Sequence, residues 1–227
     1  MVYGKAWTMR LLLGCFVALL VCFVPLRAED IDALVKQLKS TDPDIRRAAA
    51  KSLGEAGAEA KVAVNELAGA LKDKDMFVRR FAAQALGEVG AEARSAVPAL
   101  ATALKDGKKE VGEAAADALG KMGGSTAVKP LGDVVKDKNA ETAVRRKSAE
   151  ALGKIGPDAK SAVTALTDVV KDAKVDKELR NAAVEALGNM GPAAKDALPT
   201  LTSLNKKQRD RTFRKLLDEA VKKIEAK

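Results

Sequence analysis

Apolar residues recur along the chain at three- and four-residue steps, which is the spacing of amphipathic helices. One such stretch covers residues 75–89. In a second kind of stretch, such as "VNELAGALKD" at 64–73, apolar residues stand at Val64, Leu67 and Leu71, and a lysine follows the last of them. Positions i, i+3 and i+7 lie on one face of a helix, so each stretch predicts a helix with one buried side. The two kinds of stretch alternate, and together they predict a two-helix unit.

The unit is repeated. The twelve residues "RRFAAQALGEVG" return in similar form four more times, and their Leu-Gly pairs are separated by 33, 33, 33 and 35 residues. The pairs stand at positions 53–54, 86–87, 119–120, 152–153 and 187–188. A period of this size is typical of stacked repeat units. The prediction is an all-α protein: a right-handed α-solenoid of about twelve antiparallel helices.

Two glycines in each unit have different explanations. Gly90 directly follows the first helix, where a left-handed residue commonly ends a helix without a Cβ penalty. Gly87 lies one turn earlier, inside the helix, where glycine costs about 1 kcal/mol relative to alanine. Because that cost is repeated in every unit, we expect the neighbouring helix backbone to approach closely there.

A charge pattern accompanies the repeats. An acid stands three residues before an apolar residue that is followed by arginine, as in Asp75, Val78 and Arg79. The acid is placed to cap the helix, and the arginine to reach an acid of an adjacent unit. This predicts a structural ladder of Asp–Arg pairs between stacked units. An anion-binding ladder is the alternative, but the third unit lacks both the acid and the arginine, as expected if the two residues pair with each other. Its members are Asp42, Arg46, Asp75, Arg79, Glu141, Arg145, Asp176, Arg180, Asp210 and Arg214.

The combined pattern, an acid, "VR", "AAxALGxxG" and then "VPALxxALKD", resembles the short HEAT-like repeat of the phycobilisome-lyase type. The resemblance covers residues 30–226 and implies the scaffold of that family, not its lyase activity. The predicted domain is a solenoid over residues 29–227 with capping half-units at about 30–41 and 208–227. The third unit departs from the pattern, which predicts a bend or softer junction around 106–125.

The first 28 residues form a separate segment. Lys5 and Arg10 precede a run of sixteen apolar residues, 11–26, and small Ala28 follows as a cleavage point. This is the plan of a secretory signal peptide, and the run is short for a membrane span. We therefore expect export to the periplasm or the exterior after cleavage near Ala28. A membrane anchor at residues 11–26 is the alternative, and translation starting at Met9 rather than Met1 fits a signal equally well.

The composition limits the kinds of functional site that the chain can form. The chain contains no histidine, and Cys15 and Cys22 both lie in the leader, so residues 29–227 lack the two side chains that most often bind zinc or titrate near neutral pH. No catalytic, cofactor-binding or metal-binding residue is predicted. Residues 29–204 hold 28 basic and 27 acidic residues, whereas 205–227 hold nine and four. A nearly neutral solenoid with few aromatics does not suit nucleic acid.

The leading functional hypothesis is therefore a non-catalytic protein-interaction scaffold, monomeric, that binds a protein or peptide along the second helices of the units. These helices are expected on the concave side. Small or mildly polar residues are predicted to line that groove: Asn65, Gly69, Thr102, Asp133, Asp168, Thr202 and Ser203.

Two alternatives remain open. One is an accessory subunit or enzyme that uses Lys and Asp chemistry, with Asp133 and Asp168 as a carboxylate pair. The other is a binder of anionic surfaces through the basic C-terminal helix, the only predicted route to membrane contact.

Overall fold

The computed structural model describes residues 28–226 of the chain, so the predicted signal peptide lies outside the described residues apart from Ala28. All regular elements of this part are helical. The α-helices are α1 (Ala28–Gln37), α2 (Pro43–Glu55), α3 (Val64–Ala70), α4 (Met76–Val89), α5 (Val97–Ala103), α6 (Lys109–Met122), α7 (Val128–Lys136), α8 (Thr142–Ile155), α9 (Val163–Lys171), α10 (Lys177–Asn189), α11 (Leu198–Lys207) and α12 (Arg211–Glu225).

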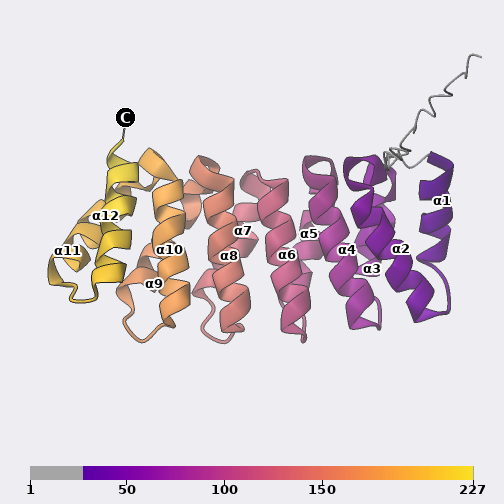
Figure 1. Cartoon of the computed structure of the whole chain (residues 1–227), viewed down its shortest axis with the longest axis horizontal. Helices are drawn as coiled ribbons and strands as arrows, with labels where there is room; N and C mark the ends of the chain where they lie inside the picture. The colour runs from indigo at the N-terminus through magenta and orange to yellow at the C-terminus, as the bar shows by residue number, and fades with distance from the viewer. Residues whose placement is uncertain (1–27, 227) are drawn as a thin grey trace, which may run out of the picture.

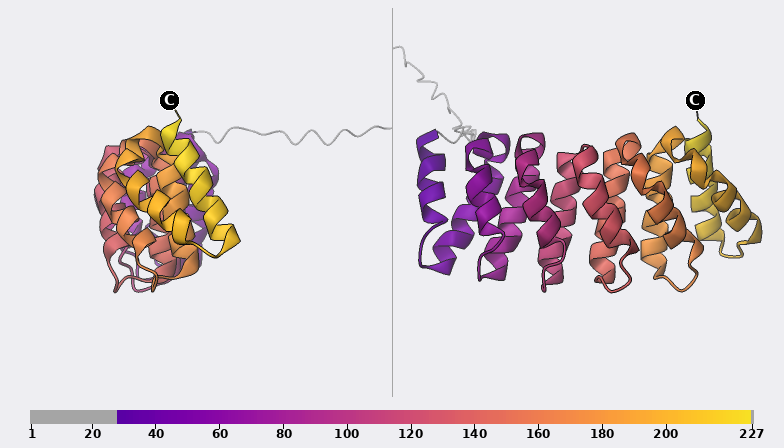
Figure 2. Two further views of the ribbon diagram at one scale, coloured as in Figure 1. Left: turned by 90° about the vertical axis from the view of Figure 1, so that its left-hand side faces the viewer. Right: turned by 180° about the vertical axis from the view of Figure 1, so that it is seen from behind.

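The helices stand side by side in one long row, with α1 and α12 at opposite ends (Figures 1 and 2). The first helices of the units, α2, α4, α6, α8, α10 and α12, form one layer, which we call the even layer. The second helices, α1, α3, α5, α7, α9 and α11, form the odd layer. This arrangement confirms the predicted α-solenoid.

Short 3-10 segments join the two layers, and the sequence pattern did not predict them. Seven residues form this segment in four units, as in Gly57–Ala63 and Gly90–Ala96, but only Ser125–Ala127 does so in the third unit. In the four units with a seven-residue segment, the glycine that opens it has a positive φ, for example 70° at Gly90. In the third unit, Gly123 and Gly124 just before the segment have positive φ. Such a conformation favours glycine and ends the preceding helix, as the sequence predicted.

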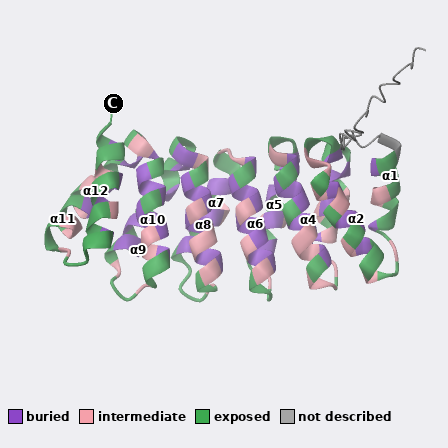
Figure 3. Ribbon diagram, in the orientation of Figure 1, coloured by how far each residue is buried: buried purple, intermediate pink, exposed green. Residues whose placement is uncertain are grey.

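The core runs along the stack between the layers. Each complete unit fully buries the leucine of its Leu-Gly pair and a leucine of its second helix, such as Leu86 and Leu100. Full burial of a leucine side chain stabilises by roughly 1.5–3 kcal/mol. Exposed residues predominate on α1, α11 and α12, whereas buried ones predominate on the central helices (Figure 3). The terminal helices therefore close the stack with polar surface.

Candidate functional site: the face of the even layer

The even layer is held together by direct contact between helix backbones. A Cβ atom built on Gly87 would lie 2.9 Å from Cα of Ala118, and one on Gly153 would lie 2.9 Å from Cα of Ala186. Real side chains do not tolerate such distances. Close approach thus explains the glycine inside each first helix, as the sequence analysis predicted.

This packing makes the even layer the tighter of the two. Even-numbered helices contact each other more extensively than odd-numbered helices do. The contacts between even-numbered helices involve glycine and alanine, as at Gly87 and Ala118. The expectation that the second helices line a concave side stays a prediction.

The exposed side of the even layer, which we call the even face, is hollowed near its N-terminal end. A hollow of about 490 Å³ extends across three successive helices, α2, α4 and α6. Small residues form its floor, namely Ala50, Gly54 and Ala85. Longer side chains surround the floor: Lys51, Glu55, Phe81, Gln84, Glu88, Asp117 and Lys121. The hollow follows from the sequence, since the glycine and alanine that permit close packing leave no side chains to fill the surface above them.

Beside the hollow lies a cluster of arginines and phenylalanines. The Arg47 guanidinium is 5.1 Å from the centre of the Phe77 ring, and the Arg80 guanidinium is 5.3 Å from Phe77 and 4.9 Å from Phe81. These are cation–π distances. Phe77 remains 39% exposed. Phe213 is the only other aromatic residue in 29–227, so the chain places two of three aromatics here.

The grouping of these side chains on one helix face could have been predicted from the sequence. Phe77, Arg80, Phe81 and Gln84 are spaced by three, one and three residues, which puts them on one face of α4. In the sequence, the small number of aromatic residues was used only as an argument against nucleic-acid binding. Their position on a shared helix face was not considered. Aromatic and arginine residues are enriched where proteins bind one another.

Alternating charges link successive units across the even face, at the edge of the hollow and farther along the row. Lys121 of α6 pairs with Glu88 of α4 at 2.7 Å, and Lys154 of α8 pairs with Asp117 of α6 at 2.5 Å. Burial opposes ionisation of Asp117, but the hydrogen bond from Lys154 and the charges of Lys154 and Lys121 together outweigh it and lower the pKa of that carboxyl. The charges here are mutually satisfied.

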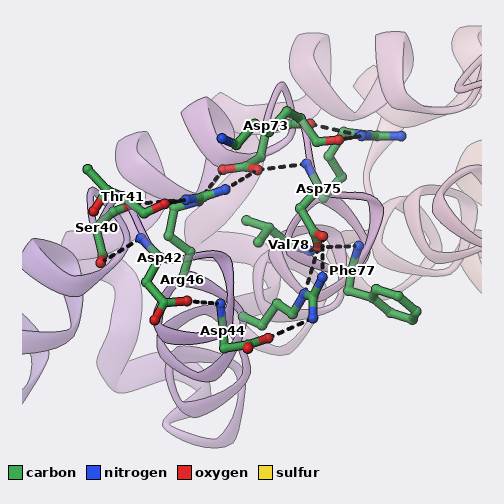
Figure 4. A network of polar contacts seen from close by, with 12 residues as sticks. Ser40, Thr41, Asp42, Asp44, Arg46, Asp73, Asp75, Phe77 and Val78 are labelled. Atoms are coloured by element: carbon green, nitrogen blue, oxygen red, sulfur yellow. Dashed lines mark hydrogen bonds and ion pairs between the residues drawn. The ribbon is translucent and has the colours of Figure 1, made fainter.

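The Asp–Arg ladder exists at the N-terminal end, but its acids differ from the predicted ones. Arg46 donates two hydrogen bonds to Asp73, at 2.7 and 2.9 Å, and Arg79 binds Asp106 in the same way. Asp73 and Asp106 end the second-helix motif, two residues before the helix-capping position. Both arginines also donate to backbone carbonyls of the preceding turn (Figure 4).

The predicted acids act mainly as helix caps. Asp42, Asp75, Asp176 and Asp210 each accept a backbone N–H in the first turn of the helix that follows. Glu141 stands at the same position without a side-chain capping bond. Asp75 is also bound by Arg47 of the previous unit, and this hydrogen bond holds the pKa of Asp75 well below its usual range. Asp210 likewise receives Lys177 at 3.0 Å.

The ladder does not continue through the later units. Arg145 donates to the carbonyl of Val135, and Arg180 donates to the carbonyl of Val170. Arg180 also lies 4.7 Å from the centre of the Phe213 ring, while Arg214 is exposed. The reason is the length of the turns. Asp172 precedes Arg180 by eight residues, whereas Asp73 precedes Arg79 by six, so the longer turn displaces the acid.

The seven predicted groove residues all lie on the odd layer and are exposed: Asn65, Gly69, Thr102, Asp133, Asp168, Thr202 and Ser203. They are spread along the row rather than brought together. Asp168 borders a hollow of about 300 Å³ between α7 and α9, and Thr202 and Ser203 border one of about 460 Å³ on α11. Binding on this face stays a prediction.

The proposed carboxylate pair has a simple explanation as surface charge. Asp133 pairs with Lys129 at 2.8 Å and with Lys136 at 3.6 Å, both on its own helix. The hydrogen bond from Lys129 lowers the pKa of Asp133, which is opposite to the shift that a general acid needs. Among residues 28–226 no cluster of acidic side chains has the arrangement of a metal site. Nor does any helix of this part have the length and hydropathy needed to cross a bilayer.

Known structures share this architecture. An engineered protein superposes with a TM-score of 0.63 at 26% identity, covering 86% of this chain and 96% of its own. The phycocyanin lyase complex of CpcE and CpcF from Nostoc sp. PCC7120 gives 0.50 at 25% identity, with 86% and 94% covered. A designed armadillo repeat protein in complex with the peptide (KR)4 gives 0.63 at 19% identity, with 86% and 99% covered. A search of curated protein sequences finds no relative.

Fold and face together define the class: an α-solenoid repeat protein that presents an extended, partly hollowed surface. The model for HEAT repeats matches residues 31–96, 91–143 and 138–222. The chain belongs to the HEAT repeat family, as its sequence pattern indicated.

Proposed function

We propose that this protein is a non-catalytic scaffold that binds another protein along the even face. The observation that carries the proposal is the hollow across α2, α4 and α6 together with the adjacent Arg–Phe cluster. A volume of about 490 Å³ lies in the range of binding pockets and accommodates one or two partner side chains. The exposed ring of Phe77 provides the kind of anchor that interfaces use.

Two further observations support a binding role. The even face is continuous over successive units, so a bound chain can contact several helices. The designed armadillo neighbour binds a peptide, which shows that an all-helical repeat stack of this general form suits extended ligands. Export from the cytoplasm, inferred from the leader sequence, belongs to the same proposal.

Affinity capture with matched variants tests the proposal. The protein is immobilised and exposed to a native envelope extract, and retained proteins are identified by mass spectrometry after a high-salt wash. We expect one partner to be retained by the wild type and by Thr102→Ala on the odd layer, and to be lost from Phe77→Ala. Equal retention by Phe77→Ala, or loss from Thr102→Ala alone, contradicts binding on the even face.

A second candidate function rests on the C-terminal end of the stack. Five cations in a stretch of nine residues are exposed and have no ion pair within the described part of the chain: Lys206, Lys207, Arg209, Arg211 and Arg214. The acid among them, Asp210, is engaged by Lys177. Such a patch suits an anionic lipid surface. Binding to phosphatidylserine vesicles that weakens as salt rises supports this function, and salt-independent binding or none contradicts it.

A further inference from the structure

Arg80 differs from Arg47 and Arg146, the arginines at the same position of α2 and α8. Arg47 pairs with Asp75 and Asp44, and Arg146 pairs with Glu150. Within residues 28–226 no acid pairs with Arg80, including Glu113, the residue in the equivalent position of α6. Its Nε atom is shielded from solvent and has no hydrogen-bond partner. Because Nε is shielded, a ligand has to approach the terminal N–H groups of Arg80, which make no hydrogen bond within residues 28–226.

The surroundings of Arg80 hold its guanidinium in place. The rings of Phe77 and Phe81 lie 5.3 and 4.9 Å from it, on the same side of α4. Arginine presents a planar fork of N–H donors that matches a carboxylate in a two-bond geometry. Because the rings restrict the fork before any ligand binds, less side-chain entropy is lost on binding.

The distance from Arg80 to the hollow fits an extended peptide. Gln84, on the wall of the hollow, follows Arg80 by four residues of α4, a rise of about 6 Å. In an extended chain, side chains two residues apart point the same way and are separated by roughly 6.5–7 Å. One side chain of a partner therefore reaches Arg80 while the next on that side enters the hollow above Ala50, Gly54 and Ala85.

We infer that the partner of the even face is a protein segment with an Asp or Glu that binds Arg80 and an apolar residue two positions away that fills the hollow beside Phe81. This inference rests on the proposed function and specifies the chemistry of its partner. Charge complementarity selects the occupant, since Arg80 is the unpaired charge of the Arg–Phe cluster. The neighbouring cation Arg47 is already neutralised by its two acids.

The test selects peptides without assuming their sequence. Phage-displayed random twelve-residue peptides are panned against the protein, and the enriched peptide is labelled for fluorescence anisotropy. We expect enriched peptides to share an Asp or Glu two residues from a large apolar residue. Arg80→Ala is expected to weaken binding at least about tenfold, as one buried charge-assisted pair implies, and Arg80→Lys to restore it only in part.

A double-mutant cycle then isolates the contact. Replacing the acid of the peptide by its amide is expected to weaken binding to the wild type but not to Arg80→Ala. Thr102→Ala serves as the matched control with unchanged affinity, and circular dichroism verifies that each variant is folded. Enrichment of basic peptides, no enrichment at all, or additive losses in the cycle overturn the inference. Peptides that need Phe77 but not Arg80 overturn it as well, while they leave the proposed function in place.

Discussion

At the scale of single residues, the glycine columns show how tightly the fold is specified. A helix interior disfavours glycine, so its recurrence at one register position implies a steric demand. That demand was readable from the sequence alone. The backbone contacts of Gly87 and Gly153 with the next helix account for it.

Gly87→Ala tests this contact. The new Cβ atom would lie 2.9 Å from the Ala118 backbone, so the helices must separate. We expect a loss of about 1–3 kcal/mol of unfolding free energy in spite of alanine's higher helix propensity. Gly69→Ala is the matched control, because its Cβ would meet nothing within 4 Å, and it is expected to stabilise by up to about 1 kcal/mol. Urea denaturation measures both, and equal effects would refute close packing as the cause.

The Arg47–Asp75 pair makes stability depend on pH. The pKa of Asp75 is lowered in the folded state by the hydrogen bond from Arg47, so its contribution is fully present above the unfolded pKa of about 3.9. That contribution is lost as the pH falls through the lower folded pKa. Asn also caps helices, so Asp75→Asn mainly removes the charge.

We expect Asp75→Asn to destabilise by about 1 kcal/mol at pH 7, since the pair is partly exposed. The difference from the wild type should shrink below about pH 4. Thermal unfolding at pH 7, 4 and 2.5 measures it, with exposed Asp158→Asn as a control that changes little. A difference that stays constant down to pH 2.5 would exclude the ion pair as its source.

At the scale of elements, helix positions followed from the sequence but the connections did not. Periodicity located α4 to within a residue, because apolar spacing and the Asp75 cap define its limits. The 3-10 segments have no apolar period of their own, so nothing in the pattern indicated them. The ladder was assigned to the capping acids because the sequence pattern does not show the path of the turns that connect the helices. Which acid meets Arg46 depends on the path of the turn, which tertiary packing sets.

The third unit is where elements depart most from the repeat. Gly112 replaces the ladder arginine, and the Val144 side chain packs against it instead. The 3-10 segment is reduced to Ser125–Ala127. Because this unit lacks the ladder arginine and most of the 3-10 segment, the region is expected to open more easily than the units before it. Hydrogen exchange should show less protected amides in residues 106–125 than in 73–92, and equal protection would count against a softer junction.

At the scale of the whole molecule, the distribution of small residues shapes the surface of the even layer. Ala50, Gly54 and Ala85 leave a shallow floor there, and the Arg–Phe cluster lies beside it. The groove predicted from surface polarity lies on the odd layer, and binding there stays a prediction. The hollow could not be predicted from a single unit, because residues of three stacked helices line it.

Site-specific photo-crosslinking tests the central claim most directly. A benzoylphenylalanine is placed at Gln84 on the even face in one variant and at Thr102 on the odd layer in another, both exposed positions. Each variant is irradiated in its native extract. The account predicts a discrete adduct from position 84 and none from position 102. An adduct from position 102 alone, or none from either, would contradict the assignment of the even face as the surface that binds a partner.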